Sequence, residues 1–233
     1  MALNPPFLEL IVPVALGISA YIMKALDRNS SIAGIAMGSI IVLTHDFRWL
    51  LAFIIFFVSA SIATLYKYKE KKELGLSQKQ RKVENVLGNG LMALIFALYG
   101  YFTGSPLAVY GFLGAVATAT ADTFSSELGV LSKNQPVSVL DFKTKVKRGA
   151  NGGVTNRGNT FMFIGASIIA ILGFLFNNWA LFWLSLWGGI FGCTVDSVLG
   201  ATLENKGSIG NSTVNFLATL SGGGLAILLA TMI

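Results

Sequence analysis

Three aspartates in this sequence lie at the ends of long apolar runs. Asp27 and Asp122 each follow such a run, and Asp196 lies near the end of another. A carboxylate at bilayer depth costs about 2.5–3.5 kcal/mol on insertion scales, so acidic residues in these places indicate a function. Mg²⁺ prefers oxygen ligands and usually takes one or two carboxylates together with phosphate oxygens. The aspartates therefore favour a site for a metal-bound polyphosphate.

Asparagine pairs open two other apolar runs. Asn85 and Asn89 are four residues apart, as are Asn211 and Asn215, so each pair lies on one face of a helix. The start of a helix presents free N–H groups and the positive end of the helix dipole, both of which favour anions. If these helix starts lie on the same side of the membrane as the aspartates, the two sets form one pocket for a metal and phosphate.

The segment between Asp122 and the next apolar run carries a second phosphate-binding pattern. Lys147 and Arg148 lead into a loop that contains Asn151, Gly152 and Gly153. Adjacent glycines present backbone N–H groups that can cradle phosphates. The loop lacks the Gly-Lys-Ser/Thr ending of a Walker A motif. A basic loop next to a membrane also binds anionic lipid headgroups, so both interpretations stay open.

Glu127 has two alternative roles. It follows Asp122 by five residues, which on an unbroken helix separates the two side chains by roughly 140°. If both carboxylates bind one metal ion, the helix must break near residues 123–126. If the helix continues, Glu127 is a solvated loop charge.

The composition identifies the surroundings of these residues as a membrane. The chain has 233 residues, of which 54% are hydrophobic and 12% are charged, with a mean hydropathy of +0.68. Soluble domains have about 25% charged residues. This excludes a water-soluble globule, a disordered tail and a nucleic-acid-binding domain, so no nucleic-acid partner is expected. We predict an all-α, polytopic membrane helix bundle that forms a single integral membrane domain over residues 1–233.

The apolar runs predict about eight spans. Continuous runs favour helices over the alternating strands of a membrane barrel. The run at 31–44 is the weakest, and it either crosses the membrane or re-enters it. The runs lie at about 7–23, 31–44, 49–66, 86–101, 107–121, 160–176, 180–199 and 214–233.

The basic residues predict the orientation. With eight spans, 16 of the 17 Lys and Arg residues fall on alternating connections, and only Arg48 lies opposite. The positive-inside rule then places these connections in the cytoplasm, including loops at about 67–85 and 122–159, and both termini outside. The charged stretch from Lys67 to Lys82 is interpreted as a solvated helical extension. We expect a prokaryotic plasma membrane with the site facing the cytoplasm.

Motifs along nearly the whole chain resemble a known family. They are Lys24-Ala25-Leu26-Asp27, Asn85-x-x-x-Asn89-Gly90, Ala121-Asp122-Thr123-Phe124-Ser125-Ser126-Glu127, Gly149-Ala150-Asn151-Gly152-Gly153-Val154, Asp196-Ser197-x-Leu199-Gly200-Ala201 and Asn211-x-x-Val214-Asn215. In these residues the chain is similar to the transmembrane-protein-nineteen-like family of integral membrane proteins, which includes plant phytyl-phosphate kinase. The resemblance implies a prenyl-phosphate kinase. Such an enzyme transfers the γ-phosphoryl group of a nucleoside triphosphate (CTP or another) to a phytyl or geranylgeranyl monophosphate and gives the diphosphate.

The candidate residues suit this chemistry, and we assign each of them a role as a hypothesis. Mg²⁺ is the expected cofactor, bound by Asp122, Glu127 and Asp196, with Lys147 and Arg148 completing the catalytic set. The prenyl tail is expected against small residues such as Ala117 and Gly192. The remaining residues are expected to bind nucleotide or acceptor phosphates: Lys24, Asp27, Asn85, Asn89, Ser126, Asn151, Gly152, Gly153, Asn211 and Asn215.

Other functions fit the same residues. A CDP-lipid-type cytidylyltransferase releases pyrophosphate, and a prenol kinase phosphorylates an alcohol. An ion-coupled transporter uses intramembrane carboxylates to bind Na⁺ or relay protons, and needs them near the bilayer midplane with access from both sides. Membrane lipids are expected partners, and a homodimer is compatible with the sequence.

Overall fold

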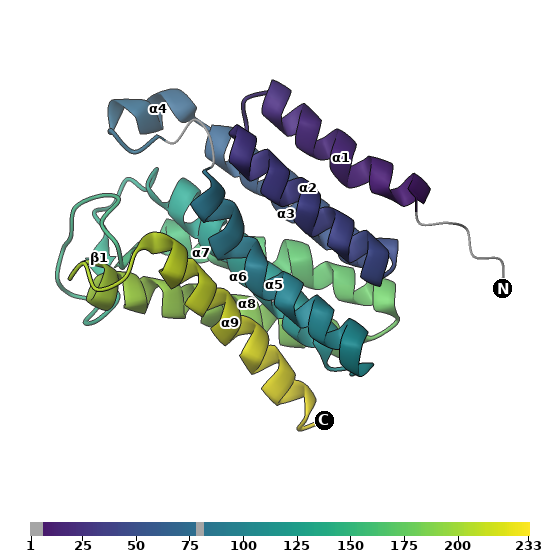
Figure 1. Cartoon of the computed structure of the whole chain (residues 1–233). Helices are drawn as coiled ribbons and strands as arrows, with labels where there is room; N and C mark the ends of the chain where they lie inside the picture. The colour runs from purple at the N-terminus through teal and green to yellow at the C-terminus, as the bar shows by residue number, and fades with distance from the viewer. Residues whose placement is uncertain (1–6, 78–81) are drawn as a thin grey trace.

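The computed structural model describes residues 7–77 and 82–233, and almost all regular structure in them is helical (Figure 1). Lys79 and Arg81, which contribute to the predicted charge pattern, lie outside the described residues. The elements are α1 (Phe7–Ile22), α2 (Arg28–Thr44), α3 (Phe47–Leu65), α4 (Tyr68–Glu73), α5 (Val83–Thr103), α6 (Ala108–Gly129), β1 (Val137–Ser138), β2 (Gly153–Val154), α7 (Asn156–Ala170), the 3₁₀ helix η1 (Ile171–Phe176), α8 (Trp179–Leu199), the π-helical turn η2 (Gly200–Glu204) and α9 (Asn211–Ala230).

Each of the eight predicted apolar runs coincides with a long helix. In the described part of the chain, five helical segments are long and apolar enough to cross a membrane: Phe47–Leu65, Val83–Thr103, Asn156–Phe176, Trp179–Glu204 and Asn211–Ala230. Helices α1 and α2 have 16 and 17 residues, and α6 contains a polar C-terminal third. Membrane crossing by these three helices stays a prediction.

Helix α6 is the centre of the bundle. It packs against α3, α5, α7, α8 and α9, and every residue from 111 to 121 is buried (Figure 1). Small residues allow this close approach, as is typical of helix packing in membranes. A Cβ atom on Gly189 would lie 2.9 Å from the Cβ atom of Ala117, and one on Gly192 would lie 2.8 Å from the Ala218 carbonyl oxygen. The expected prenyl site against Ala117 and Gly192 is therefore wrong, because helix backbones already fill that space.

This packing predicts opposite outcomes for two glycines of α9. A Cβ atom on Gly222 would lie 2.6 Å from the Gly188 carbonyl oxygen, whereas one on Gly224 meets nothing within 4 Å. Gly222→Ala should lower the free energy of unfolding by about 1–3 kcal/mol through overpacking. Gly224→Ala should leave it unchanged or raise it by up to about 1 kcal/mol, because alanine favours helix. Denaturation of the detergent-solubilised protein measures both, and equal effects would contradict this packing.

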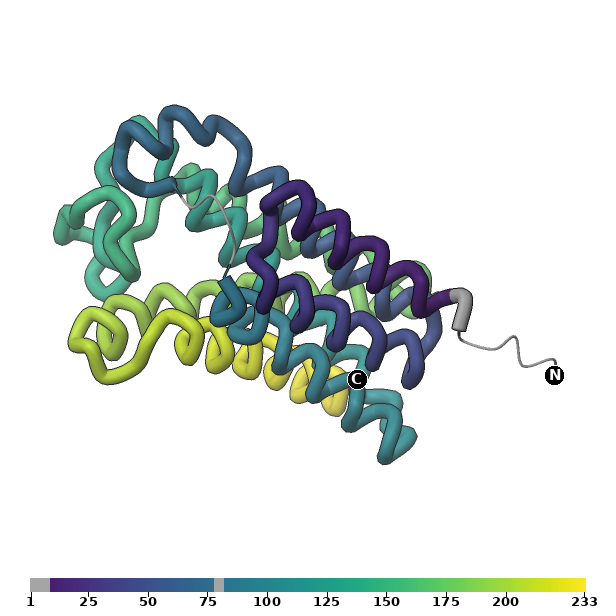
Figure 2. Tube along the Cα trace, turned by 45° about the horizontal axis from the view of Figure 1, so that its top comes forward, coloured from purple at the N-terminus to yellow at the C-terminus, as the bar shows by residue number. Residues whose placement is uncertain are grey.

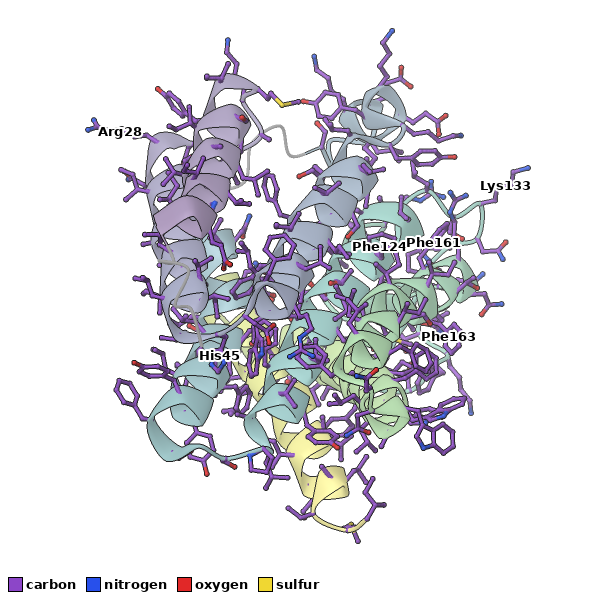
Figure 3. All side chains as sticks on the ribbon, turned by 90° about the vertical axis from the view of Figure 1, so that its right-hand side faces the viewer. Arg28, His45, Phe124, Lys133, Phe161 and Phe163 are labelled. Carbon is purple, nitrogen blue, oxygen red and sulfur yellow. The ribbon has the colours of Figure 1, made fainter. Side chains whose placement is uncertain are left out.

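The polar segments gather at one end of the bundle. Helix α4, residues 130–155 and the turn after η2 lie together there, whereas the C-terminus and the start of α1 lie towards the other end (Figure 2). Within residues 130–155, β1 and β2 form an antiparallel pair with Val137 opposite Val154. The side chains of Lys133 and Arg28 point away from the bundle (Figure 3).

The expected loops are shorter than predicted. The segment at 122–159 is not a loop throughout, because α6 continues to Gly129 and α7 begins at Asn156. The hydroxyl groups of Thr123 and Ser126 donate to the Ala119 and Thr123 carbonyl oxygens, so polar residues continue the helix. Similarly, 67–85 contains α4 and the start of α5. The C-terminal turns of α6 are packed as well, with Phe124 beside Phe161 of α7 (Figure 3).

Candidate functional site

A cavity of about 340 Å³ opens at the polar end of the bundle. Its walls are the C-terminal parts of α6 and α8, the first turns of α5 and α9, and the glycine loop before α7. Helices that run in opposite directions thus place carboxylates and helix N-termini around one space. The predicted site residues that line it are Asn85, Asn89, Asp122, Ser126, Glu127, Asn151, Gly152, Gly153, Asp196, Asn211 and Asn215.

Asp122 and Asp196 form a carboxylate pair in this cavity. They come from α6 and α8, and the Asp122 side chain lies within hydrogen-bonding distance of the Asp196 carboxyl group. Within the described residues, Oδ2 of Asp196 is buried and has no hydrogen-bond donor. Two carboxylates this close repel each other unless a cation or a shared proton lies between them. The pair therefore fits a hard divalent cation that takes its other ligands from phosphate and water.

This pair supplies two carboxylates rather than a complete set of protein ligands. The described part of the chain holds no group of three or more His, Cys, Asp and Glu side chains that could bind a metal ion. Mg²⁺ commonly keeps several waters or binds substrate phosphates, so two protein carboxylates are sufficient for it. The donor set is thus compatible with a metal ion that takes its remaining ligands from a bound phosphate.

Glu127 lies on a continuous helix, but it is not a solvated loop charge. Helix α6 is unbroken around Glu127, whose carboxylate lines the cavity and also points to α3 and α4. The Thr64 hydroxyl donates to Oε1 over 3.0 Å, and the ammonium group of Lys71 donates to Oε2 over 2.7 Å. Because both oxygens have protein partners, Glu127 joins the wall of the cavity to α3 and α4.

Lys71 corrects the interpretation of the charged stretch as a solvated extension. Its side chain is fully buried, and besides Glu127 it donates to the carbonyl oxygens of Ala63 at 3.0 Å and Thr64 at 2.6 Å. All three ammonium protons thus have an acceptor. The neighbouring Lys72 is exposed. A lysine in a run of charges carries no sequence signal that distinguishes it from its neighbours, so this contact was missed.

The four asparagines lie where their spacing predicts. Asn85 and Asn89 occupy the first two turns of α5, and Asn211 and Asn215 those of α9. The Asn89 amide donates to the Asn85 carbonyl oxygen at 2.9 Å. The two helix starts are in close contact. The amide pairs therefore face the cavity from two adjacent helix N-termini, which favour anions.

The glycine loop packs onto the end of α8. Gly152 has a φ of +73°, and a Cβ atom there would lie 2.7 Å from the Ser197 carbonyl oxygen. Only glycine combines this backbone conformation with so close an approach. The Asn205 amide donates to the Asn151 carbonyl oxygen at 3.3 Å, and Glu204 bonds to the Asn151 side chain. These contacts hold the glycine loop next to the end of α8 that carries Asp196.

Four predicted residues lie outside the cavity lining. Lys147 is exposed and Arg148 is partly exposed in the segment that precedes the glycine loop. Asp27 is the N-cap of α2, since it accepts from the backbone amide of Ser30 at 2.7 Å and from its hydroxyl at 2.6 Å. These bonds, led by the hydroxyl, lower the pKa of the Asp27 carboxyl group. Lys24 is exposed nearby, so the structure gives both residues a place at the α1–α2 turn rather than in the site.

The cavity also contains residues that sequence reasoning missed. Ser197 follows Asp196 directly and was visible in the motif. Glu204 lies eight residues after Asp196, as the last residue of the π-helical turn η2, and helical periodicity does not predict its position. π-Helical turns occur frequently at functional sites. Thr123, Ser125, Thr155 and Leu76 are further lining residues that were not predicted.

Comparison with known sequences identifies the family of the chain. The family model described as integral membrane protein DUF92 matches residues 11–223. The chain belongs to the DUF92 family. All the predicted site residues lie within the matched range, so the cavity is built from the part of the chain that defines this DUF92 protein.

Three DUF92 relatives cover most of the chain. The uncharacterized membrane protein MJ0933 of Methanocaldococcus jannaschii is 32% identical, and the match covers 96% of this chain and 93% of that protein. Protein PGR of Arabidopsis thaliana is 30% identical over 92% of this chain and 86% of its own length. The uncharacterized membrane protein sll0875 of Synechocystis is 31% identical over 82% and 77% respectively. No solved structure matches the chain.

Proposed function

We propose that this DUF92 protein is a membrane-embedded, Mg²⁺-dependent prenyl-phosphate kinase. The observation that carries the proposal is the meeting of Asp122 and Asp196 in one cavity with the N-terminal asparagines of α5 and α9. The resemblance to the transmembrane-protein-nineteen-like family supplies the substrate class. Phosphoryl transfer needs chiefly positioning and neutralisation of charge, which a preformed polar cavity provides.

The charges of the cavity support dependence on a divalent cation. Among the described residues that line it, four carry carboxyl groups and none is Lys or Arg. Lys71 neutralises Glu127, so the acidic character of the lining comes from Asp122, Asp196 and Glu204. An anionic phosphate would be repelled from this space. Asp122 and Asp196 would hold Mg²⁺, which would neutralise charge on the reacting phosphates.

The reaction needs no protein nucleophile. An anionic oxygen of the prenyl monophosphate attacks the γ-phosphorus of the nucleotide and forms a new O–P bond. The bond between the γ-phosphorus and its bridging oxygen breaks, and the nucleoside diphosphate leaves with the electron pair. The backbone amide of Gly153 donates to the Ala150 carbonyl oxygen at 3.0 Å, so the amide of Gly152 would hold the nucleotide phosphates. Lys147 and Arg148, which precede this loop, would attract them. The asparagines would orient the acceptor phosphate.

The carrier alternative meets a structural obstacle. A second cavity of about 370 Å³, lined by residues such as His45, Trp49 and Tyr110, opens at the opposite end of the bundle. Between the two cavities, α6 is buried at every residue from 111 to 121. Alternating access would require this close-packed helix to move. A cytidylyltransferase fits the cavity as well as a kinase does, and the products distinguish the two.

The assay uses purified protein with Mg²⁺, a γ-labelled nucleoside triphosphate and geranylgeranyl or phytyl monophosphate. Label in a prenyl diphosphate is the expected result. Release of pyrophosphate with formation of a nucleotide-linked lipid would instead show a cytidylyltransferase, and label in the product from a free prenol would show a prenol kinase. No label transfer with any of the four common nucleotides would overturn the proposal.

The proposal includes an orientation with the cavity towards the cytoplasm of a prokaryotic plasma membrane. The basic connections lie at the cavity end, as the positive-inside rule requires. Ser208 is exposed in the turn before α9 and Thr103 is exposed at the other end of the bundle, while the one native cysteine, Cys193, is 2% exposed. In intact cells, a membrane-impermeant maleimide should label Thr103→Cys and label Ser208→Cys only after permeabilisation. The reverse pattern would contradict this orientation.

A further inference from the structure

An almost wholly apolar cavity of about 120 Å³ lies beside the polar one. Residues of α1, α2, α3 and α5 line it, among them Ala20, Met37, Leu50 and Phe53. All four are side chains without charge or hydrogen-bonding groups. This space therefore suits a hydrocarbon and excludes a phosphate or a metal ion.

The polar and the apolar cavity share helix α5 as a wall. Asn85 and Asn89 line the polar cavity, and the residues that follow each of them, Val86 and Gly90, line the apolar cavity. Consecutive residues of an α-helix differ by about 100° in direction and 1.5 Å in height. The two cavities thus lie on adjoining sides of the same two turns of α5. A molecule with an anionic head and an apolar chain would meet a polar and an apolar surface side by side on this helix.

A glycine leaves the apolar cavity open. Gly34 of α2 lines it, and a Cβ atom on Gly34 would meet nothing within 4 Å. Other lining glycines are tightly packed, since a Cβ atom on Gly38 would lie 2.8 Å from the Pro13 Cβ atom and one on Gly90 would lie 2.6 Å from the Met37 Cε atom. Gly34 is therefore the position where a larger side chain would fill the cavity with least disturbance of the helices.

The volume limits how much of a chain can enter. An engineered protein cavity of about 150 Å³ accommodates benzene, which has six carbon atoms. A cavity of about 120 Å³ then holds roughly five carbon atoms, the size of one isoprene unit. The rest of a long chain would remain among bilayer lipids. Such a site recognises the chain next to the phosphate and tolerates different chain lengths.

We propose that this apolar cavity binds the isoprene unit adjacent to the phosphate of the acceptor lipid. The proposal rests on the proposed function for the nature of the head group, and it replaces the excluded position against Ala117 and Gly192. Specificity then comes from two neighbouring faces of α5. The asparagines take the phosphate, and Val86 and Gly90 take the first carbon atoms of the chain.

Photocrosslinking tests this binding without requiring turnover. The probe is geranylgeranyl monophosphate with a diazirine on the isoprene unit next to the phosphate, added to the full-length protein in nanodiscs without nucleotide. We expect label on α2 and α5 residues of the apolar cavity, such as Met37 and Val86. Gly34→Phe should reduce this label by roughly tenfold, because burial of the chain is lost.

Gly224→Phe is the matched control, because a Cβ atom there also meets nothing within 4 Å and Gly224 lines neither cavity. It should label as the wild type does. If Gly34→Phe lowers the melting temperature of the protein, Gly34→Leu replaces it as the smaller variant. Unchanged labelling of the folded Gly34 variant, or wild-type label confined to other helices, would overturn the proposal.

The outcomes separate this proposal from the kinase proposal. Label in the apolar cavity without phosphate transfer in the kinase assay would leave the chain site standing and reject the kinase. Transfer of phosphate with label elsewhere would do the reverse. Equal labelling by the corresponding alcohol would show a site for bilayer hydrocarbon rather than for the acceptor, and would also overturn the proposal.

Discussion

Asp122→Asn is expected to lower Mg²⁺-dependent transfer of phosphate to a prenyl monophosphate by about 100-fold or more. Asparagine has nearly the same shape as aspartate, so the variant should fold, but it removes one of the two negative charges that would bind the cation beside Asp196. A metal ion stabilises transition-state charge by several kcal/mol, and each 1.36 kcal/mol corresponds to about tenfold in rate. The rate with saturating Mg²⁺ and labelled nucleotide measures the effect.

Two further variants make this experiment specific. Asp196→Asn should have an effect of the same order, and the double variant should be little worse than either single variant, because both residues serve one cation. Glu73→Gln is the control, since Glu73 is an exposed carboxylate of α4 outside the cavity lining, and it should retain wild-type activity. Normal turnover by a folded Asp122→Asn variant would remove the aspartate pair from the reaction.

Lys71→Met should destabilise the protein by about 3–5 kcal/mol, the largest effect on stability that we expect. The substitution leaves Glu127, whose side chain is 17% exposed, without its cationic partner. Removing one member of a buried ion pair commonly has a cost of this size, because the remaining charge stays desolvated. For a chain of this length the melting temperature should fall by roughly 10 °C.

The neighbouring residues provide the controls for Lys71. Lys72→Met should change the free energy of unfolding by less than about 0.5 kcal/mol, because Lys72 is exposed. Adding Glu127→Gln to Lys71→Met should restore a large part of the lost stability, since the unpaired charge is removed. A melting temperature of the Lys71→Met variant equal to that of the wild type would show that the pair does not anchor α4.

The sequence was most informative where polar residues interrupt apolar runs. Asp122, Asp196 and the four asparagines were predicted to share a pocket, because a polar side chain at bilayer depth is costly unless it has a partner or a ligand. The alternation of basic connections also predicted which helix ends meet. The structure places these residues in one cavity, at the shared end of five helices. Residues far apart in the sequence could be predicted to meet, because a helix crosses a membrane in only one of two directions.

Other features depend on contacts that leave no local pattern. Lys71 was invisible because a buried and a solvated lysine have the same neighbours in the sequence. The apolar run ends at residue 121 although α6 continues to Gly129, because the hydropathy falls where Thr123 and Ser126 begin to bond back to the helix backbone. Asp27 was predicted to bind phosphate. An aspartate three residues before Ser30 is equally typical of a helix N-cap, which is the role that Asp27 has.

The position of a bound divalent cation tests the central claim most directly. A crystal of the protein grown with Mn²⁺ in place of Mg²⁺ and a non-hydrolysable nucleotide gives the metal position by anomalous scattering. We predict an anomalous peak coordinated by Asp122 and Asp196, with the nucleotide phosphates between the glycine loop and the asparagines of α5 and α9. A metal ion bound elsewhere, or a nucleotide bound outside this cavity, would contradict the proposed site.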